Sequence, residues 1–455
     1  MNERISEDRG RDVPLVALVG RPNVGKSTLF NRLTKSNKAI VDPTPGVTRD
    51  RHYGPVVWDE RRIILVDTGG IELGGADDVI TDQIQDQTWA AIQEADIIIH
   101  VMDGVGGVLA EDYEVVSRLR RAGKPVYHLV NKVDGPEREG EILSQFYELG
   151  IDDLWAVSAA HGYGLKTFFE AFFAALPDGD ERPDIPEEAI RVACIGRPNV
   201  GKSSLINKLL GQDRMLVSDI PGTTRDSVDS LLEKNGKQYL LIDTAGIRRK
   251  GKVREKIEKF SVMRALSSLE RCDIALLLVD ASEGITEQDT KVIGYAMERG
   301  RACLILVNKW DLVRGEKKRE RWIMDEVTMA TKFMPYAPIL KISALTGMSL
   351  TKILLTINEV FAQYTSTFTT NSLNQILKRA TETHVPPLHK GRRLKLYYTT
   401  QVGTSPPTFV LFANYPKGIH FSYYRFLVNQ FREELGLIHS PVKLLLRERK
   451  RKKYG

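Results

Sequence analysis

The octapeptide GRPNVGKS occurs twice in the chain, at residues 20–27 and 196–203. Each copy fits the pattern G-x-x-x-x-G-K-S and lies between a β-rich run and an amphipathic run, the context of a phosphate loop between a strand and a helix. In such a loop backbone N–H groups face phosphate oxygens, the lysine reaches the β- and γ-phosphates, and the serine hydroxyl coordinates Mg²⁺. The expected phosphate-binding residues are Gly20, Arg21, Pro22, Asn23, Val24, Gly25, Lys26 and Ser27, and then Gly196, Arg197, Pro198, Asn199, Val200, Gly201, Lys202 and Ser203.

An aspartate ends the apolar run that follows each phosphate loop. Asp67 follows IILV and Asp243 follows YLLI. This is the position of an aspartate that holds Mg²⁺ through water, and the next glycine of the motif, Gly70 or Gly246, would offer its N–H to the γ-phosphate. The two segments are Asp67, Thr68, Gly69, Gly70 and Ile71, and Asp243, Thr244, Ala245, Gly246 and Ile247.

NKVD and NKWD predict which base is bound. A carboxylate accepts N–H bonds from N1 and N2 of guanine but would face the unprotonated N1 of adenine, so Asp134 and Asp311 favour guanine. The lysine stems can cover the base plane, and SA dipeptides further on would place backbone N–H groups near guanine O6. The expected base-binding residues are Asn131, Lys132, Val133, Asp134, Ser158 and Ala159, and Asn308, Lys309, Trp310, Asp311, Ser343 and Ala344.

The motifs recur in one order at offsets of 176, 177 and 185 residues, which indicates a duplicated domain of roughly 165 to 175 residues. Short β-rich runs alternate with amphipathic stretches in each copy. That alternation predicts a mostly parallel α/β sheet with helices on both faces, and ligands bind at the carboxyl ends of its strands. After the second copy the order helix, strand, strand, helix, strand predicts a small α+β domain.

Composition sets the remaining limits. The predicted parts are a lead-in (1–11), domain 1 (12–176), an acidic linker rich in proline (177–188), domain 2 (189–364), the α+β domain (365–446) and a basic tail (447–455). The net charge of the chain is +6. Residues 365–455 carry +12, so the rest of the chain carries −6, and we expect an anionic partner for the C-terminal part.

Neither a membrane span nor a signal segment is expected. Cys194, Cys272 and Cys303 have no metal-ligand spacing and predict buried thiols in a reducing cytoplasm.

Together, GRPNVGKS, PGVTRD, DTGGI, NKVD and SA resemble the translation-factor-related class of GTPases. Two such sets followed by a KH-like domain resemble the Der (EngA) family of bacterial double GTPases, over residues 12–446. That resemblance implies GTP hydrolysis, Mg²⁺ dependence, and service in assembly of the large ribosomal subunit through its rRNA. We expect the chain to act as a monomer.

The resemblance also implies roles in hydrolysis. Ile71 and Ile247 stand where Ras-like proteins carry a water-orienting glutamine, so intrinsic hydrolysis should be slow. Asn23 and Asn199 match an asparagine that holds a stimulating potassium ion in related GTPases; the alternative is that each merely braces its loop. Thr48 and Thr224 match the switch threonine over Mg²⁺, with Thr44 and Thr223 as alternatives. The residues expected to act in hydrolysis are Lys26, Thr48, Gly70, Lys202, Thr224 and Gly246, and those expected at Mg²⁺ are Ser27, Thr48, Asp67, Ser203, Thr224 and Asp243.

The two copies differ in charge after the DxxG motif. Residues 72–94 carry −6, whereas residues 248–271 carry +6. One hypothesis is that the second segment presents a nucleotide-dependent surface to RNA while the first docks on the basic C-terminal domain; solvated helix faces are the alternative.

The C-terminal domain has no G-x-x-G loop, so it departs from the RNA-binding KH pattern. Basic residues near Tyr397 and Tyr398 still offer phosphate contacts and stacking, although tyrosines in a strand are more often core residues. The basic residues are Lys390, Arg392, Arg393 and Lys395. Two other functions stay open at this point: a GTPase associated with RNA modification, and an RNA-binding scaffold with structural GTP.

Overall fold

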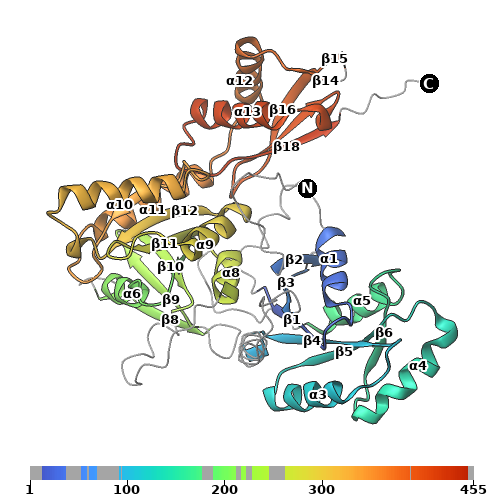
Figure 1. The fold of residues 1–455 in the computed structure, drawn as a ribbon. Helices are drawn as coiled ribbons and strands as arrows, with labels where there is room; N and C mark the ends of the chain where they lie inside the picture. Colours follow the sequence, from blue (N-terminus) through green and yellow to red (C-terminus); the bar gives the residue numbers. More distant parts are fainter. Residues whose placement is uncertain are drawn as a thin grey trace. The chain divides into compact units, whose positions relative to one another are not determined.

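A computed structural model of the chain describes residues 13–36, 53–58, 61–68, 92–93, 95–176, 188–211, 217–221, 228–244, 262–389 and 391–448. They form two compact units, one with the first repeat and one with the second repeat and the C-terminal domain (Figure 1). The predicted residues outside this part of the chain are Thr44, Thr48, Gly69, Gly70, Ile71, Thr223, Thr224, Ala245, Gly246, Ile247 and Lys390, together with most of both charged segments and of the basic tail.

The first unit contains a six-stranded sheet in the order β2-β3-β1-β4-β5-β6. Its strands are β1 Leu15–Val19, β2 Tyr53–Trp58, β3 Arg61–Asp67, β4 Ile97–Asp103, β5 Val126–Asn131 and β6 Leu154–Ala156. The central strands β1 and β4 are buried along their whole length and mostly apolar, as parallel strands covered on both faces are. β2 alternates buried and exposed residues and pairs antiparallel with β3 at the edge. The predicted mostly parallel sheet is confirmed, with this edge strand as its antiparallel member.

Helices cover both faces of that sheet. On one face α1 Lys26–Ser36 and α5 Leu165–Ala175 share a core with β1, β3 and β4; the aromatic face of α5 supplies Phe168, Phe169 and Phe172. On the other face α3 Ala110–Ala122 and α4 Glu139–Phe146 pack on Met102 and Val130. Short 3-10 turns, η2 Pro136–Arg138 and η3 Tyr147–Leu149, flank α4.

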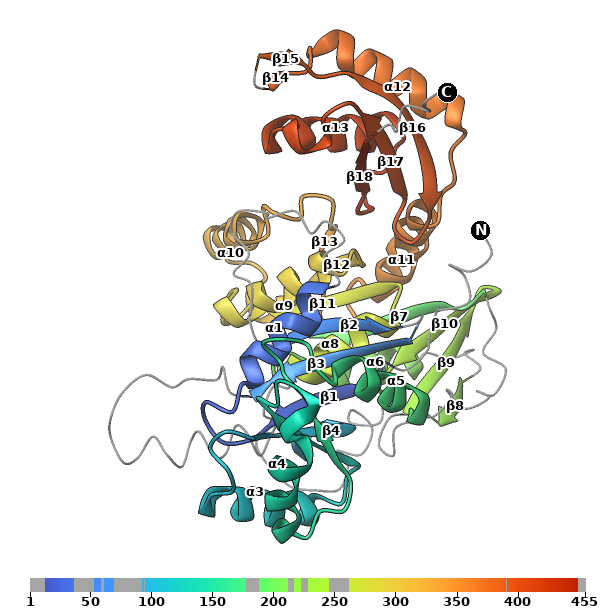
Figure 2. The ribbon, with the colours of Figure 1, turned by 90° about the vertical axis from the view of Figure 1, so that its right-hand side faces the viewer.

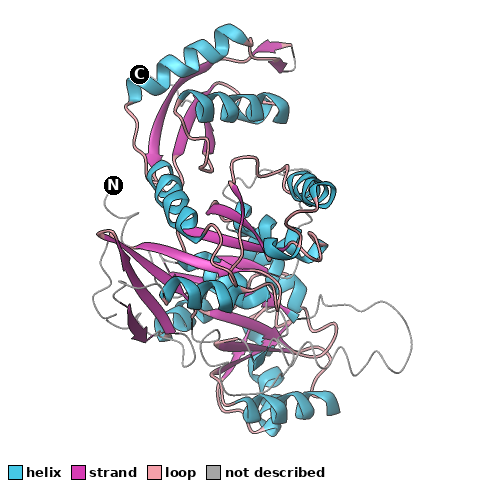
Figure 3. Cartoon of the chain, turned by 90° about the vertical axis from the view of Figure 1, so that its left-hand side faces the viewer, coloured by secondary structure: helices cyan, strands magenta, loops and turns pink. Residues whose placement is uncertain are grey.

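The second repeat folds in the same way, with a longer sheet in the order β13-β12-β11-β7-β10-β9-β8. Its strands are β7 Ile190–Ile195, β8 Val217–Pro221, β9 Val228–Lys234, β10 Lys237–Ile242, β11 Ile274–Asp280, β12 Ala302–Asn308 and β13 Ile339–Lys341. Its helices are α6 Lys202–Leu210, α8 Val262–Arg271, α9 Glu287–Glu298, α10 Lys317–Ala330 and α11 Leu350–Tyr364, with the 3-10 turn η5 Trp310–Leu312. α6 and α11 share one core with β7, β11 and β12. α9 also contacts β11 and β12, but its residues are not part of that core. In Figure 3 the strands run between these helices.

The C-terminal domain has the predicted order of helix, strand, strand, helix, strand. These elements are α12 Thr370–Thr383, β16 Leu396–Gly403, β17 Thr408–Ala413, α13 Phe421–Glu434 and β18 Lys443–Glu448, with a short pair β14 Leu388–His389 and β15 Arg392–Arg393 and the turn η6 Pro416–Gly418. Both helices pack on one face of the three-stranded sheet (Figure 2). Leu377 of α12 and Phe431 of α13 share a buried core with Phe409 of β17.

This domain contacts the second repeat within the same unit. The backbone N–H of Ser405 donates to the carbonyl of Tyr364 at 2.9 Å, and the N–H of His439 donates to Oε1 of Gln363 at 2.7 Å. The guanidinium of Arg432 lies over the buried ring of Tyr336, 5.0 Å from its centroid. Burial lowers the pKa of Arg432, with Tyr336 opposing the shift. The contact therefore combines backbone hydrogen bonds with a desolvated cation on an aromatic ring.

Two further findings concern the whole described chain. No helix in it is both long and apolar enough to cross a membrane. Its three cysteines are free; Cys272 and Cys303 are buried and Cys194 is partly buried. Burial raises the pKa of the Cys194 and Cys272 thiols to about 12, so both are protonated and unreactive at neutral pH.

Candidate nucleotide sites

Each phosphate loop leaves a buried central strand and enters a helix that begins at its lysine. The glycine before that lysine has a positive φ, 98° at Gly25 and 100° at Gly201. A Cβ on Gly25 would lie 2.3 Å from Nδ2 of Asn131, and one on Gly201 would lie 2.2 Å from Nδ2 of Asn308. Only glycine fits both the conformation and the space, because the guanine motif packs directly against the loop.

The loop lysines fold across their own loops. Nζ of Lys26 donates to the carbonyls of Gly20 and Arg21, both at 2.7 Å. Nζ of Lys202 donates to the carbonyls of Gly196 and Arg197, at 2.8 and 2.6 Å. Burial lowers the pKa of Lys26 to about 8, against the opposing effect of Asp67. A phosphate would offer this desolvated ammonium the anion that its carbonyl partners do not supply.

The asparagine of NKxD joins three predicted motifs. Nδ2 of Asn131 donates to the carbonyl of Val24 at 2.7 Å, and its Oδ1 accepts the N–H of Ala159 at 2.8 Å. The N–H groups of Ala159 and Ala344 were expected near guanine O6; here the first bonds Asn131. The second bonds the asparagine of its own repeat, with a distance of 2.9 Å. The asparagine therefore holds the phosphate loop and the SA loop together.

The lysine of NKxD is held by an aspartate that belongs to none of the sequence motifs. Nζ of Lys132 lies 2.6 Å from Oδ2 of Asp103, and Nζ of Lys309 lies 2.5 Å from Oδ2 of Asp280. Burial acts to raise the pKa of Asp103, but hydrogen bonds from Lys132 and the loop backbone hold it below its usual value. The same balance applies to Asp280. These aspartates end β4 and β11 and fix the lysine stems predicted to cover the base.

The two base-selecting aspartates have different surroundings. Oδ1 of Asp134 accepts the hydroxyl of Ser158 at 2.8 Å. Asp311 has a buried Oδ1 that finds no hydrogen-bond partner among the described residues. The hydroxyl of Ser343 accepts the N–H of Thr346 at 3.1 Å, as that of Ser158 accepts the N–H of His161, but among the described residues no bond joins Ser343 to Asp311. A buried carboxylate oxygen without a donor is costly, and the N–H groups of guanine are donors of the required kind.

The predicted Mg²⁺ aspartates also differ. Asp67 is the last residue of β3 and is buried. Asp243 follows the end of β10 with a φ of 58°, and its N–H donates to Oδ1 of Asp229 at 3.0 Å. Burial raises the pKa of Asp243, and Arg264 and Arg271 oppose the shift. The adjacent threonines are anchored: Oγ1 of Thr68 donates to the carbonyl of Leu18 at 2.5 Å.

One predicted surface residue proves to be internal. The +6 segment 248–271 ends at Arg271, but Arg271 is only 7% exposed and pairs with the buried Asp229 of β9. α8 buries this end of the segment against the fold, so Arg271 does not contribute to an RNA-facing surface, and that part of the hypothesis is wrong. Pattern counting missed it because Asp229 lies 42 residues away.

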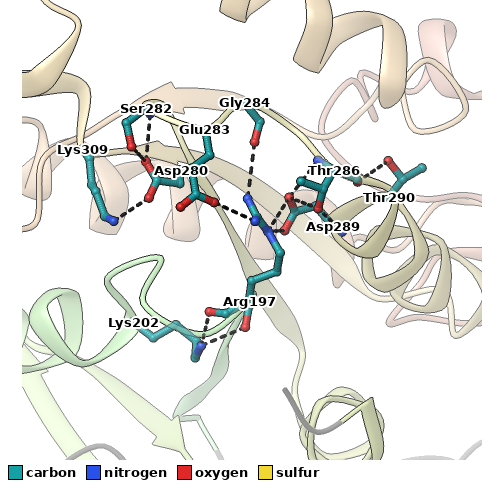
Figure 4. Close-up of polar contacts among 11 residues, drawn as sticks. Arg197, Lys202, Asp280, Ser282, Glu283, Gly284, Thr286, Asp289, Thr290 and Lys309 are labelled. Atoms are coloured by element: carbon teal, nitrogen blue, oxygen red, sulfur yellow. Dashed lines mark hydrogen bonds and ion pairs between the residues drawn. The ribbon is translucent and has the colours of Figure 1, made fainter. Parts of the chain in front are cut away.

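The phosphate-loop arginines reach acidic helix ends. Nε of Arg197 donates to both carboxylate oxygens of Asp289 at 2.9 Å, and Nη1 donates to Glu283 at 2.8 Å (Figure 4). In the first repeat Nε of Arg21 lies 3.2 Å from Oδ2 of Asp112. The loop is thus tied at its second residue to the helix after β4 or β11.

Comparisons with known proteins agree with this arrangement. The chain matches the family of 50S ribosome-binding GTPases twice, over residues 15–132 and 191–309. Residues 368–447 match the KH-domain-like C-terminal family of EngA bacterial GTPase enzymes. GTPase Der of Desulforapulum autotrophicum is 51% identical over 445 residues, which are 95% of this chain and 90% of that protein. GTPase Der of Geotalea daltonii is 49% identical over 442 residues, 97% of this chain and 100% of that protein.

The chain belongs to the GTPase Der family. As a member of the Der family it is a GTP-binding and GTP-hydrolysing switch that binds the large ribosomal subunit and acts in its assembly. The predicted family, function and tandem GTPase fold with a KH-like domain are confirmed. The crystal structure of Era with MgGDPNP and nucleotides 1506-1542 of 16S ribosomal RNA is 23% identical over 57% of this chain and 93% of that chain. Its TM-score is 0.29, which is too low to support a structural argument.

Proposed function

We propose that both repeats bind GTP with Mg²⁺ and hydrolyse it slowly, with potassium as the stimulating ion. The observation that carries the nucleotide sites is the shared arrangement of loop, NKxD and SA segment around Asn131 and Asn308. The orphaned Oδ1 of Asp311 supports guanine in the second site, since guanine N1–H would supply its missing donor. In the first site the exposed carboxylate of Asp134 has the same role, and Ser158 orients it.

Mg²⁺ fits the donor set of each site, because a hard cation prefers carboxylate and hydroxyl oxygens. Ser27 is the second residue of helix α1, next to Lys26, and Asp67 ends β3. We propose Ser27, Asp67 and Thr48 as the residues that hold it in the first site, and Ser203, Asp243 and Thr224 in the second. When bound, the ion neutralises charge that develops on the β- and γ-phosphate oxygens.

The positioning of the reacting phosphate falls to the chain's own groups. Lys26 or Lys202 would leave its loop carbonyls and pair with the β- and γ-phosphates, while the N–H of Gly70 or Gly246 bonds the γ-phosphate. Ile71 and Ile247 offer no hydrogen bond to the attacking water, so turnover without an activator is slow.

Potassium would be held in part by Asn23 and Asn199. Both side chains are exposed, and their φ angles are 64° and 59°. Within the described part of the chain neither amide has a hydrogen-bond partner, which disfavours the alternative that each asparagine merely braces its loop. A free amide oxygen at the phosphate loop is a suitable ligand for a large monovalent cation.

A potassium titration at constant ionic strength tests this proposal. Sodium replaces potassium in matched buffers, and the readout is turnover of Asp134→Asn and Asp311→Asn, which isolate the second and first sites. Turnover should rise with potassium and lose that rise on Asn23→Ala or Asn199→Ala in the corresponding site. Equal turnover in sodium and potassium would remove potassium from the proposal and leave the GTPase activity intact.

Contact with rRNA is proposed through the basic edge of the KH-like domain. Tyr397 and Tyr398 are each 40% exposed, so they are not core residues, and Tyr398 stacks on Phe412 with ring centroids 4.4 Å apart. Arg393 and Lys395 beside them are exposed. Such a surface combines stacking with phosphate neutralisation. The protein would act as a monomer in the cytoplasm. Its two GTPase domains would span residues 12–176 and 189–364, and its KH-like domain residues 365–446.

This contact is tested by the salt dependence of binding to ribosomal particles. Arg393→Ala with Lys395→Ala should weaken binding at low salt and flatten its dependence on salt concentration. Lys378→Ala is the matched control, because Lys378 lies on α12 and pairs with Glu382. Equal losses in the two variants would argue against a contact at this edge.

A further inference from the structure

The arginine at the second position of each phosphate loop ties that loop to the turn that follows β4 in the first repeat and β11 in the second. This turn also holds the lysine of NKxD, since Asp280 begins it and pairs with Lys309. The arginine and the lysine therefore bring the phosphate half and the base half of a site to one short segment, 280–289 in the second repeat (Figure 4).

In the second repeat the arginine is fully engaged. Nε of Arg197 bonds Asp289, Nη1 bonds Glu283 at 2.8 Å, and Nη2 lies 3.4 Å from the carbonyl of Gly284. Asp289 is itself fixed, because it accepts the N–H and hydroxyl of Thr286 at 3.0 and 2.9 Å in a capping box. Burial acts to lower the pKa of Arg197, but Asp289 and Glu283 raise it above its ordinary value.

In the first repeat the equivalent set is incomplete. Gly106 occupies the position of Glu283, and Leu109 occupies that of Thr286. In the described part of the chain, Nε of Arg21 and Oδ1 of Asp112 are buried without a hydrogen-bond partner, although Nε lies 3.2 Å from Oδ2 of Asp112. Among the described residues, Arg21 makes one well-formed hydrogen bond, from Nη2 to the carbonyl of Gly107 at 3.0 Å. The same arginine thus has one carboxylate partner instead of two.

We propose that Glu283 is a positioning residue that completes a clamp on the second phosphate loop, and that its absence from the first repeat gives the two sites different rates of nucleotide release. The clamp acts through the backbone of Arg197, whose carbonyl accepts a hydrogen bond from Nζ of Lys202. A loop held in place before binding loses less conformational entropy when it closes on phosphates. This proposal rests on the proposed GTP sites, and it gives a cause for different rates of nucleotide release from them.

The expected change in the rate of nucleotide release depends on how exposed the two carboxylates are. Glu283 is 60% exposed at its side chain, whereas Asp289 is 2% exposed. A partly exposed ion pair changes a rate by about twofold to fivefold, and salt screens it. Glu283 therefore adjusts the release rate in a salt-dependent manner, while Asp289 supplies the fixed anchor.

The test is release of fluorescent N-methylanthraniloyl-GDP from the full chain, chased with excess GDP at about 0.05 M and 0.5 M salt. In the Asp134→Asn background, which leaves the second site to be read, Glu283→Gln should speed release about threefold at low salt and not at high salt. Glu287→Gln is the matched control: it removes a charge from the exposed start of α9, and Arg197 has no contact with it. In the Asp311→Asn background, Gly106→Glu should slow release from the first site about twofold, and Gly106→Gln should not.

The Gly106 variants are feasible because a Cβ there would meet Nη2 of Arg21 at 3.1 Å, the movable end of a long side chain. Unchanged release in Glu283→Gln, or an equal change in Glu287→Gln, would overturn the clamp. If neither Gly106 variant binds nucleotide, the Glu283 comparison decides alone. Failure of the Asp134→Asn parent to bind labelled GDP would instead count against the proposed second GTP site, and this outcome is distinct from failure of the clamp.

Discussion

Nδ2 of Asn308 donates to the carbonyl of Val200 at 2.7 Å, so the guanine motif holds the phosphate loop by a buried hydrogen bond across 108 residues of sequence. Its Oδ1 accepts the N–H of Ala344 at 2.9 Å. One amide thus fixes two loops on which the nucleotide would lie. Asn131 makes the same two bonds in the first repeat.

Removing this amide should weaken nucleotide binding. Asn308→Ala leaves the Val200 carbonyl and the Ala344 N–H unsatisfied, at a cost of about 2 kcal/mol, which corresponds to a GTP affinity lower by about 30-fold. The measurement is a fluorescent GTP titration in the Asp134→Asn background. Asn374→Ala is the control, because Asn374 joins α12 to β16 by similar bonds in the KH-like domain. An unaltered affinity in Asn308→Ala would show that the loops hold their positions without it.

The buried pair of Arg271 with Asp229 should be important for the stability of the second domain. Arg271→Met leaves a buried carboxylate unpaired, which costs about 3–5 kcal/mol. The readout is thermal unfolding of the full chain, and Arg271→Met with Asp229→Leu should recover much of the loss. Arg118→Met provides the contrast, because the Arg118 pair with Glu114 is exposed and should contribute less than about 1 kcal/mol. Equal effects of the buried and exposed changes would contradict the burial argument.

The pair Asp229 with Arg271 also marks the limit of prediction from sequence. GRPNVGKS and NKxD were predictable because consecutive residues build their loops, and both repeats keep them. Partners such as Asp229 and Arg271 come together only when β9 and α8 pack, so charge counting placed Arg271 on the surface. Glu283 was missed for the same reason, since Arg197 lies 86 residues away.

Lys26 should make nucleotide binding at the first site depend on pH. Its pKa is lowered to about 8, and a bound phosphate would raise it. Above about pH 8 the free site is therefore increasingly neutral and must take up a proton to bind, so affinity should fall by up to about tenfold per pH unit. GTP titrations between about pH 7.5 and 9 in the Asp311→Asn background measure this. Lys26→Arg, which stays charged, should remove the decline; a flat profile in the parent would contradict the lowered pKa.

The first domain should lose stability in mild acid. Nδ1 of His100 lies 3.0 Å from Nδ1 of His128 on the neighbouring strand. Burial lowers the pKa of His100 to about 3, with His128 and Lys26 adding to the shift. Burial also lowers the pKa of His128 to about 4; Arg120 adds to this shift and Asp153 opposes it.

The free energy of unfolding depends on pH because the unfolded chain takes up protons that the folded histidine pair does not. Below an ordinary pKa of about 6.5 the unfolded chain binds protons that the folded pair does not, so the free energy of unfolding falls as the pH drops from about 6.5 toward 4. The slope from His100 is at most about 1.4 kcal/mol per pH unit. Calorimetric melting of the first domain measures it, and His100→Met should flatten the slope. His161→Asn, at an exposed site, should not; a slope unchanged by His100→Met would contradict the assignment.

The differences between the repeats were harder to predict than their likeness. Asp134 and Asp311 end equivalent NKxD motifs, yet Ser158 donates to Asp134, whereas the buried Oδ1 of Asp311 has no hydrogen-bond partner in the described part of the chain. Tyr398 reads as an inward-facing strand residue in sequence, but the open face of the KH-like sheet leaves it partly exposed. Such features depend on which face of an element the rest of the fold covers, which local pattern does not determine.

The central claim is a ribosome-assembly switch read by two guanine nucleotide sites. Co-sedimentation of the full chain with large ribosomal subunits tests it most directly, with a non-hydrolysable GTP analogue, GDP or no nucleotide, at several salt concentrations. Binding should require the analogue, weaken as salt rises, and decrease in Asp134→Asn and Asp311→Asn to different extents. Equal binding with the analogue, with GDP and without nucleotide would contradict the account.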